Sequence, residues 1–167
     1  SLGQIYFQWG QLAEAHRCFE RAHQVAELSG LSDAALYHGV VRSRLLEMQG
    51  DAAAAAEEIR RTVEHMRAEA PAVVGEEVIA QLVRVELAQG RLPAAEAAFS
   101  LLPGERAYPS FFAQGRFGLP ALPTDSRVVP SLCALYLSAL RIALYRAQTR
   151  GETELLAAGI ELAGQLI

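Results

Sequence analysis

Apolar residues recur along most of this chain at the three- and four-residue spacing of amphipathic helices, and short turn sequences interrupt them. The pattern predicts an all-α fold of about eight helices in four antiparallel pairs. The predicted helices cover about 1–9, 12–29, 32–49, 52–69, 73–89, 92–102, 131–150 and 152–166. Ser32 and Asp51 stand at expected N-cap positions, and Pro93 stands in a first turn, where proline is tolerated.

Three glycines spaced forty residues apart, Gly10, Gly50 and Gly90, indicate an internal repeat. Five residues after each glycine stands an alanine, and four residues further on stands a large apolar residue. The alanines are Ala15, Ala55 and Ala95, and the large residues are Phe19, Ile59 and Phe99. Glycine ends a helix in the left-handed conformation without steric cost, and alanine lets two helices approach closely. A fourth, weaker unit centres on Gly151, with Leu156, Ile160 and Ala163 behind it.

The first unit resembles a tetratricopeptide (TPR) repeat. Its Leu2-Gly3-x-x-Tyr6, Gly10, Ala15, Phe19 and Ala22 match the TPR pattern. The second and third units have Arg42-Ser43 and Leu82-Val83 where the pattern begins with Leu-Gly. The resemblance implies an α-α superhelix, a right-handed TPR-like solenoid in one domain. Its repeats would cover about 1–30, 31–70, 71–102 and 131–167.

The repeat length allows more than one family of helical repeats. A forty-residue spacing exceeds the TPR period of roughly 34 and approaches the ~40–47 of HEAT and armadillo repeats. We favour TPR because the first unit fits its pattern closely and longer helices account for the excess. The string from Val78 through Val83-Arg84 and Gly90 to Ala95 is similar to the long-period TPR region of MalT-like, LuxR-type bacterial transcription regulators.

This narrower resemblance implies a place in a multidomain protein. Such regulators are signal-transduction ATPases in which an ATPase module precedes the TPR-like sensor region and a helix-turn-helix follows it. Both ends of the chain read as the middle of a helix, so we expect a fragment of a longer protein. The alternative is a stand-alone TPR adaptor that scaffolds other proteins.

Residues 103–130 break the pattern. They hold five of the seven prolines, together with Tyr108, Phe111, Phe112 and Phe117. Long segments of this kind are uncommon in compact domains, and four aromatic residues argue against plain disorder. Three interpretations stay open. The segment is an irregular cover on the edge of the helices, with a short helix near Ser110–Gln114, or it lies in or over a binding groove, or it is a flexible linker.

Charge and composition narrow the function classes. The chain has a net charge of −4 and a pI of about 5.6, so it lacks the excess of basic residues typical of a DNA-binding domain. We therefore expect no direct nucleic-acid binding. The most apolar stretch, 128–145, is interrupted by Pro130 and Arg141, which predicts a core helix instead of a membrane span. Cys18 and Cys133 stand among apolar neighbours and are expected to be buried in a reducing cytoplasm.

Catalytic and metal-binding motifs are absent from the sequence. There is no P-loop, no Gly-x-Gly-x-x-Gly, no His-Glu-x-x-His and no Cys-x-x-Cys. The four histidines are His16, His23, His38 and His65, and His16 and His23 stand two helical turns apart without an evident third ligand. We therefore expect no enzyme, no metal site and no cofactor. Among the large apolar residues we expect Phe19, Phe99, Tyr136 and Leu137 to be buried. The pattern does not decide whether Trp9 is buried.

The TPR resemblance also implies a binding surface, because the first helix of each pair lines the concave face. Counting back from the turn glycines gives the candidates Phe7, Tyr37, Arg44, Glu47, Glu77, Arg84, Arg141 and Tyr145. Arginine and aromatic residues are common interface anchors, and arginine can hold a carboxylate or phosphate through two parallel hydrogen bonds. We expect the partner to be a protein, a peptide or a small anionic effector. A homo-oligomer is compatible with this interpretation, and we expect no binding to a membrane. The alternative is that the arginines only pair with Glu47 and Glu77.

Overall fold

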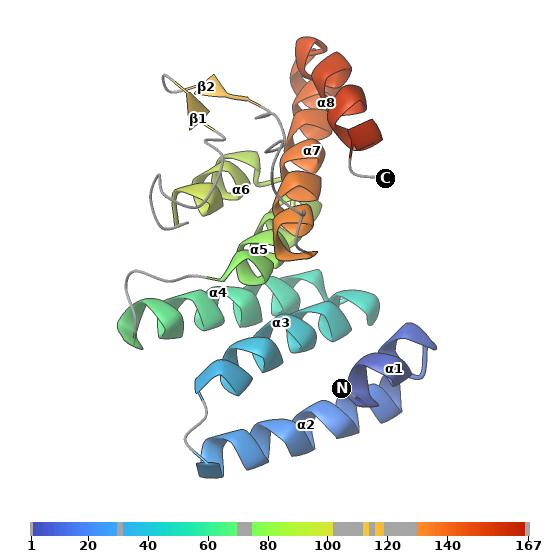
Figure 1. Ribbon diagram of the computed structural model, residues 1–167, viewed down its shortest axis with the longest axis vertical. Coiled ribbons are helices and arrows are strands. Elements are labelled where there is room, and N and C mark those ends of the chain that lie inside the picture. Colours follow the sequence, from blue (N-terminus) through green and yellow to red (C-terminus); the bar gives the residue numbers. More distant parts are fainter. Residues whose placement is uncertain are drawn as a thin grey trace. The chain divides into compact units, whose positions relative to one another are not determined.

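The computed structural model describes residues 2–29, 32–69, 75–101, 112–113, 116–118 and 130–165. These residues form an all-α structure with eight α-helices (Figure 1). The helices are α1 (Leu2–Gln8), α2 (Leu12–Ser29), α3 (Ser32–Met48), α4 (Ala52–Glu69), α5 (Glu76–Ala88), α6 (Leu92–Ala98), α7 (Pro130–Arg150) and α8 (Glu154–Gln165). The chain divides into two compact units, Ser1–Glu69 and Ala70–Ile167.

The predicted helix boundaries agree with these bounds to within a few residues. The largest difference is in α6, which ends at Ala98 and continues as a single 3₁₀ turn, η1 (Phe99–Leu101). Pro93 lies in the first turn of α6, as expected. Asp51 caps α4, because its Oδ1 accepts a hydrogen bond of 2.9 Å from the backbone N–H of Ala54.

Three turns between paired helices share the same glycine conformation and the same two backbone hydrogen bonds. Gly10, Gly50 and Gly90 have φ angles of 72°, 85° and 72°, in the left-handed region. In the first turn, the N–H of Gly10 donates to the carbonyl of Phe7 at 3.1 Å, and the N–H of Gln11 donates to that of Tyr6 at 2.9 Å. The same two bonds recur forty and eighty residues later at 2.9–3.0 Å. This is the Schellman arrangement, which satisfies the last carbonyl groups of a helix.

The fourth turn closes differently. Gly151 also has a φ of 72°, but its N–H donates to the carbonyl of Ala147 at 3.2 Å, four residues back. A single bond of this kind is the simpler left-handed helix ending. The fourth hairpin therefore departs from the other three in its turn, in line with its weaker sequence similarity.

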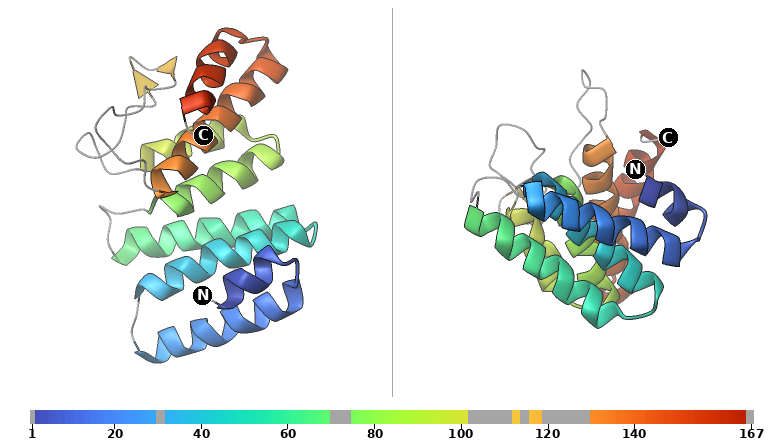
Figure 2. Two further views of the ribbon diagram at one scale, coloured as in Figure 1. Left: turned by 45° about the vertical axis from the view of Figure 1, so that its right-hand side comes forward. Right: turned by 90° about the horizontal axis from the view of Figure 1, so that it is seen from below.

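The unit of α1–α4 is built from two helical hairpins. Neighbouring helices pack in the order α1–α2, α2–α3 and α3–α4 (Figures 1 and 2). Ala15 and Phe19 of α2 form a buried cluster with Val41 and Leu45 of α3. Between α3 and α4, the buried Ser43 hydroxyl donates to the carbonyl of Ala55 at 2.8 Å. The alanine five residues after a turn glycine thus lies where two helices come close together.

The unit that follows contains α5–α8. Here α5 packs against α6 and α7, and α7 packs against α8 (Figure 2). Its core includes Ile79, Val83, Leu135, Tyr136 and Ile142, all fully buried. The described residues also include two short antiparallel strands, β1 (Phe112–Ala113) and β2 (Arg116–Phe117), with Phe112 opposite Phe117.

This strand pair corrects the expected short helix near Ser110–Gln114. Phe112 and Phe117 face each other across the two strands, and aromatic residues favour strands over helical turns. The other residues between 103 and 129 lie outside the described ranges, apart from Gly118. The three interpretations of that segment therefore stay predictions.

Burial confirms most of the expected core and corrects part of it. Phe19, Phe99 and Tyr136 are buried, but Leu137 is 45% exposed. Leu137 lies on the same side of α7 as the exposed Arg141 and Leu144, four and seven residues further on, and this side faces away from the core that buries Tyr136. Cys18 and Cys133 are free thiols and are only partly buried. Trp9 is 70% exposed. No helix among the described residues is long and apolar enough to cross a membrane.

Candidate functional site

The eight predicted binding residues divide equally between the two units. Four lie on α1 and α3, and four lie on α5 and α7. A continuous groove made by all eight therefore stays a prediction.

In the unit of α1–α4, Arg44 and Glu47 are the described polar candidates. They lie one turn apart on α3, and both are partly buried. Each also interacts with other groups of the chain. Phe7 of α1 is partly buried against the α2–α3 cluster, so part of its ring belongs to the core. Tyr37 lies on α3, but its side chain falls outside the described part of the structure.

In the unit of α5–α8, the four candidates come from two helices that pack together. Glu77 and Arg84 lie two turns apart on α5, and both are partly buried. Arg141 and Tyr145 lie one turn apart on α7, where Arg141 is exposed. The packing of α5 against α7 makes these helices neighbours, and a shared ligand for their polar side chains stays a prediction.

Tyr145 has a well-defined neighbour. A Cβ atom added to Gly90 would lie 3.3 Å from the Tyr145 hydroxyl oxygen, so this phenol sits over the turn between α5 and α6. A glycine at this turn therefore serves two purposes, the left-handed backbone and the space for the tyrosine. Tyr145 of α7 therefore lies close to the turn that follows α5.

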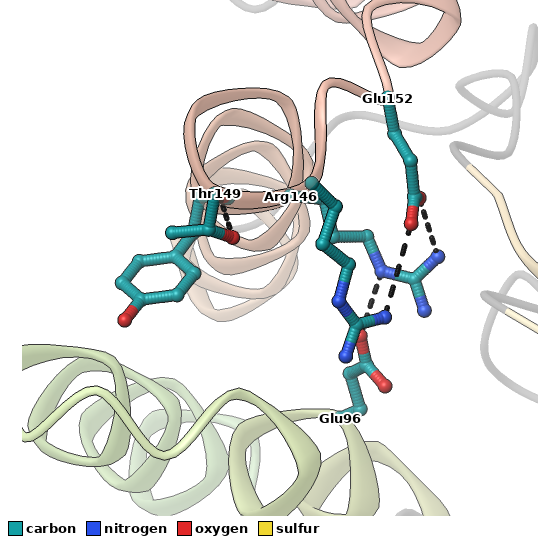
Figure 3. Close-up of polar contacts among 6 residues, drawn as sticks. Glu96, Arg146, Thr149 and Glu152 are labelled. Atoms are coloured by element: carbon teal, nitrogen blue, oxygen red, sulfur yellow. Dashed lines mark hydrogen bonds and ion pairs between the residues drawn. The ribbon is translucent and has the colours of Figure 1, made fainter.

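A polar cluster that was not predicted from the sequence is centred on Arg146, the residue after Tyr145. Arg146 Nε donates to Glu96 Oε1 at 2.7 Å, and Arg146 Nη1 donates to Glu152 Oε2 at 3.0 Å (Figure 3). The Arg146 and Glu96 side chains are only 16% and 18% exposed. The hydrogen bond that Arg146 donates to Glu96 raises the pKa of Arg146, against the opposing effect of burial. One guanidinium thus joins α6, α7 and the turn before α8.

A signal for this cluster is present in the repeat. Arg146 stands five residues before Gly151, where Ile5, Leu45 and Val85 precede the other turn glycines. A charged residue at an otherwise apolar repeat position predicts a buried partner of opposite charge, because an unpaired buried charge is costly. The cluster is closed by its own carboxylates, so its chemistry is that of a structural link.

Two further polar side chains are buried in α5. Gln81 and Glu86 are 2% and 3% exposed, and Glu86 Oε2 lies 3.0 Å from Arg91 Nε just beyond the turn. The backbone N–H of Arg91 also donates to the Glu86 carbonyl at 2.9 Å. The side-chain pair and the backbone bond together hold the end of α5 to the start of α6.

One of the described histidines, His38, forms a contact between two helices. His38 of α3 is buried, and its Nε2 lies 3.5 Å from Glu20 Oε1 of α2, while His16 Nδ1 lies 4.0 Å from the same oxygen. Among the described residues no group of three or more His, Cys, Asp or Glu side chains could hold a metal ion. The arrangement is therefore a contact between α2 and α3.

Comparison with models of known protein families, with curated proteins and with solved structures finds no match to this chain. The function is therefore inferred from the repeat and from the side chains that the two units expose.

Proposed function

We propose that this chain is a non-catalytic, TPR-like binding module that forms the sensor region of a bacterial LuxR/MalT-like transcription regulator. The observation that supports this best is the identity of the three turns at Gly10, Gly50 and Gly90. Each has the same left-handed glycine, and each is followed by a fully buried alanine five residues later. A hairpin repeated in this way builds an extended surface by stacking, in this proposal a right-handed solenoid, and such surfaces typically bind partners.

The proposed ligand is a protein or peptide segment, or a small anionic effector. Arg44, Arg84 and Arg141 would supply its positive charge, since a guanidinium can hold a carboxylate or phosphate in a planar fork. Arg44 and Arg84 are partly buried, so their side chains lose less freedom on binding than fully exposed ones. Tyr145 would add aromatic contact area one turn from Arg141.

Effector binding would act by shifting an equilibrium. A ligand moves a protein between an autoinhibited and an active state only by its difference in affinity for the two. In the proposed regulator, the two states would differ in how this region contacts the modules before and after it. Such a regulator acts in the cytoplasm, which is the location we propose.

The test uses two defined probes, inorganic phosphate and a short polyglutamate peptide. A ligand present at 100 times its dissociation constant stabilises the folded state by about 2.7 kcal/mol, which a thermal-shift measurement resolves. We expect at least one probe to stabilise the chain, and Arg44→Ala with Arg84→Ala to weaken that effect. Arg67→Ala is the matched control, because Arg67 is an exposed arginine of α4 outside the proposed set. Unchanged affinity in the double variant would rule out these arginines as the binding site.

The second candidate is a stand-alone TPR adaptor. The glycine-to-alanine turns favour it equally, because they belong to the repeat and say nothing of neighbouring domains. The coding sequence on either side separates the two functions. An upstream P-loop and a downstream helix-turn-helix support the regulator, and their absence supports the adaptor.

A further inference from the structure

A buried histidine of α3 stands at a repeat position that is otherwise apolar. His38 lies twelve residues before Gly50, and the residues twelve before the next two turn glycines are Val78 and Ala139. All three are buried, since His38, Val78 and Ala139 are 7%, 4% and 0% exposed. An imidazole at such a position needs a polar partner, because burying a polar group without one is costly.

A carboxylate of the neighbouring helix α2 lies within reach of this histidine. His38 Nε2 lies 3.5 Å from Glu20 Oε1, and His16 Nδ1 lies 4.0 Å from the same oxygen. The side chains of Glu20 and His16 are 37% and 49% exposed, whereas that of His38 is 7% exposed. Two imidazole rings, one from each helix, therefore share one carboxylate oxygen, and the ring from α3 is the one sheltered from solvent.

Other charged groups on the helices around α3 form pairs of their own. Arg42 lies one turn after the buried histidine, and its Nε lies 3.7 Å from Glu58 Oε2 of α4. On α2, Arg17 donates to Glu14 at 2.8 Å, and α1 carries no charged residue. The solvent-exposed charged or titratable side chains of α2 and α4 include Arg21, Arg61, Glu64 and His65, and those of His23 and Glu27 lie outside the described part of the structure. Among the pairs described, Glu20 is the carboxylate that meets the buried imidazole.

We propose that the His38–Glu20 contact is a pH-sensitive clasp between α2 and α3, which tightens when His38 takes up a proton. Imidazole changes its charge between about pH 5 and pH 8. The charged ring meets a carboxylate in surroundings that screen the attraction less than water does, and the neutral ring loses that attraction. Because the folded chain then binds the proton more tightly than the unfolded chain, the added stability is present at the acid end of this range and is lost as the pH rises.

The clasp acts between two hairpins of the same unit. Helix α2 is the second helix of the first hairpin, and α3 is the first helix of the second. A proton on His38 therefore strengthens the packing of one hairpin on the next. This inference does not rest on ligand binding, because His16, Glu20 and His38 lie outside the set proposed to hold an anionic or peptide ligand.

The first test measures urea unfolding of the full chain at about pH 8 and about pH 6, on either side of the imidazole range. On acidification, the unfolding equilibrium constant of the parent should fall relative to that of His38→Gln by roughly twofold to fivefold, the range typical of a partly exposed ion pair. Glu20→Gln should lose the same pH dependence. Glu14→Gln is the matched control, since this carboxylate of α2 pairs with an arginine that keeps its charge at both pH values.

A second readout follows the histidine directly and needs no unfolding. The ring-proton NMR signal of His38 is the one missing from His38→Gln, and its position against pH gives the midpoint of proton uptake. Glu20→Gln should move this midpoint to lower pH, whereas Glu14→Gln should leave it in place. This comparison keeps the histidine, so it holds even if His38→Gln does not fold and the signal is assigned by other NMR correlations.

Three results would overturn the inference. The parent chain and Glu20→Gln could show the same change in stability between the two pH values. The midpoint of His38 could stay in place or rise when Glu20 loses its charge. Finally, the ring could stay neutral down to about pH 5, which would mean that burial outweighs the attraction of the carboxylate.

Discussion

Gly39 on α3 allows a direct test of how closely two helices approach. A Cβ atom added at this position would overlap the Thr62 Oγ1 atom of α4 and lie 2.9 Å from the Thr62 Cβ and Cγ2 atoms. Thr62 is only 9% exposed and its hydroxyl donates to the carbonyl of Glu58, so it has little room to move aside. Gly39→Ala should therefore separate α3 from α4, although alanine is the better helix former.

The magnitude follows from two opposing effects. Overpacking a core typically costs ~1–3 kcal/mol, and the upper end applies here because three atoms of Thr62 are too close. Replacing glycine by alanine in a helix returns about 1 kcal/mol. We expect Gly39→Ala to lower the free energy of unfolding by about 2 kcal/mol.

The sign should reverse in a Thr62→Gly background. This change removes the three atoms nearest to the new Cβ, so the helix preference should dominate. Gly39→Ala should then raise the free energy of unfolding by up to about 1 kcal/mol. The coupling between the two positions is therefore about 3 kcal/mol, measurable in a double-mutant cycle by urea unfolding with far-UV circular dichroism and Trp9 fluorescence.

A second glycine serves as the control. Gly50 has a φ of 85° and no atom within 4 Å of an added Cβ, so Gly50→Ala suffers only backbone strain. Its cost of roughly 1–2 kcal/mol should be the same with and without the Thr62→Gly change. If Gly39→Ala has the same effect in both backgrounds, the close approach of α3 and α4 is not what requires glycine.

Three further predictions concern single side chains. Asp51→Ala should cost about 1 kcal/mol of stability through loss of the cap on α4, whereas Asp51→Asn should keep most of it in urea unfolding. Burial raises the pKa of Tyr136 above its usual 10.0, so the unfolded chain loses this proton first and stability falls as pH rises past 10.0. Tyr136→Phe should reduce that fall in alkaline unfolding. Arg146→Met should cost about 2 kcal/mol in urea unfolding, because Glu96 keeps a largely buried charge without its partner. Adding Glu96→Gln should restore part of that loss.

The features predicted correctly from the sequence are those set by local chemistry. A left-handed residue at the end of a helix is nearly always glycine, so Gly10, Gly50, Gly90 and Gly151 mark the turns, and each has a positive φ. The cap at Asp51 follows from the same local rule. Helix boundaries next to these signals agree with the structure closely, whereas the predicted start of α5, which follows a proline, is three residues too early.

The features that could not be predicted depend on which helix surfaces pack against one another in the folded chain. Leu137 and Leu144 lie on α7 with as much apolar character as its buried residues, yet they are 45% and 49% exposed. Periodicity indicates a helix but cannot choose between two apolar sides of it. Gly39 carries no turn signal, because its requirement comes from Thr62, more than twenty residues away in the sequence. The predicted binding groove stays a prediction for the same reason, because its residues divide between two compact units.

One repeat position shows how far a pattern in sequence can define an interface. Five residues before the turn glycines stand Ile5, Leu45, Val85 and Arg146, which are 43%, 2%, 1% and 16% exposed. At Leu45 and Val85, neighbouring helices cover the position and the aliphatic side chain is buried. At Arg146 the residue is charged, and carboxylates neutralise it. At Ile5 of α1 the side chain is exposed to solvent. The repeat therefore specifies that something packs at this position, but the identity of the neighbour comes from elsewhere. An exposed isoleucine at such a position is a stronger sign of an interface than exposure alone, because scattered apolar residues are normal on protein surfaces and this one has buried equivalents in the same chain.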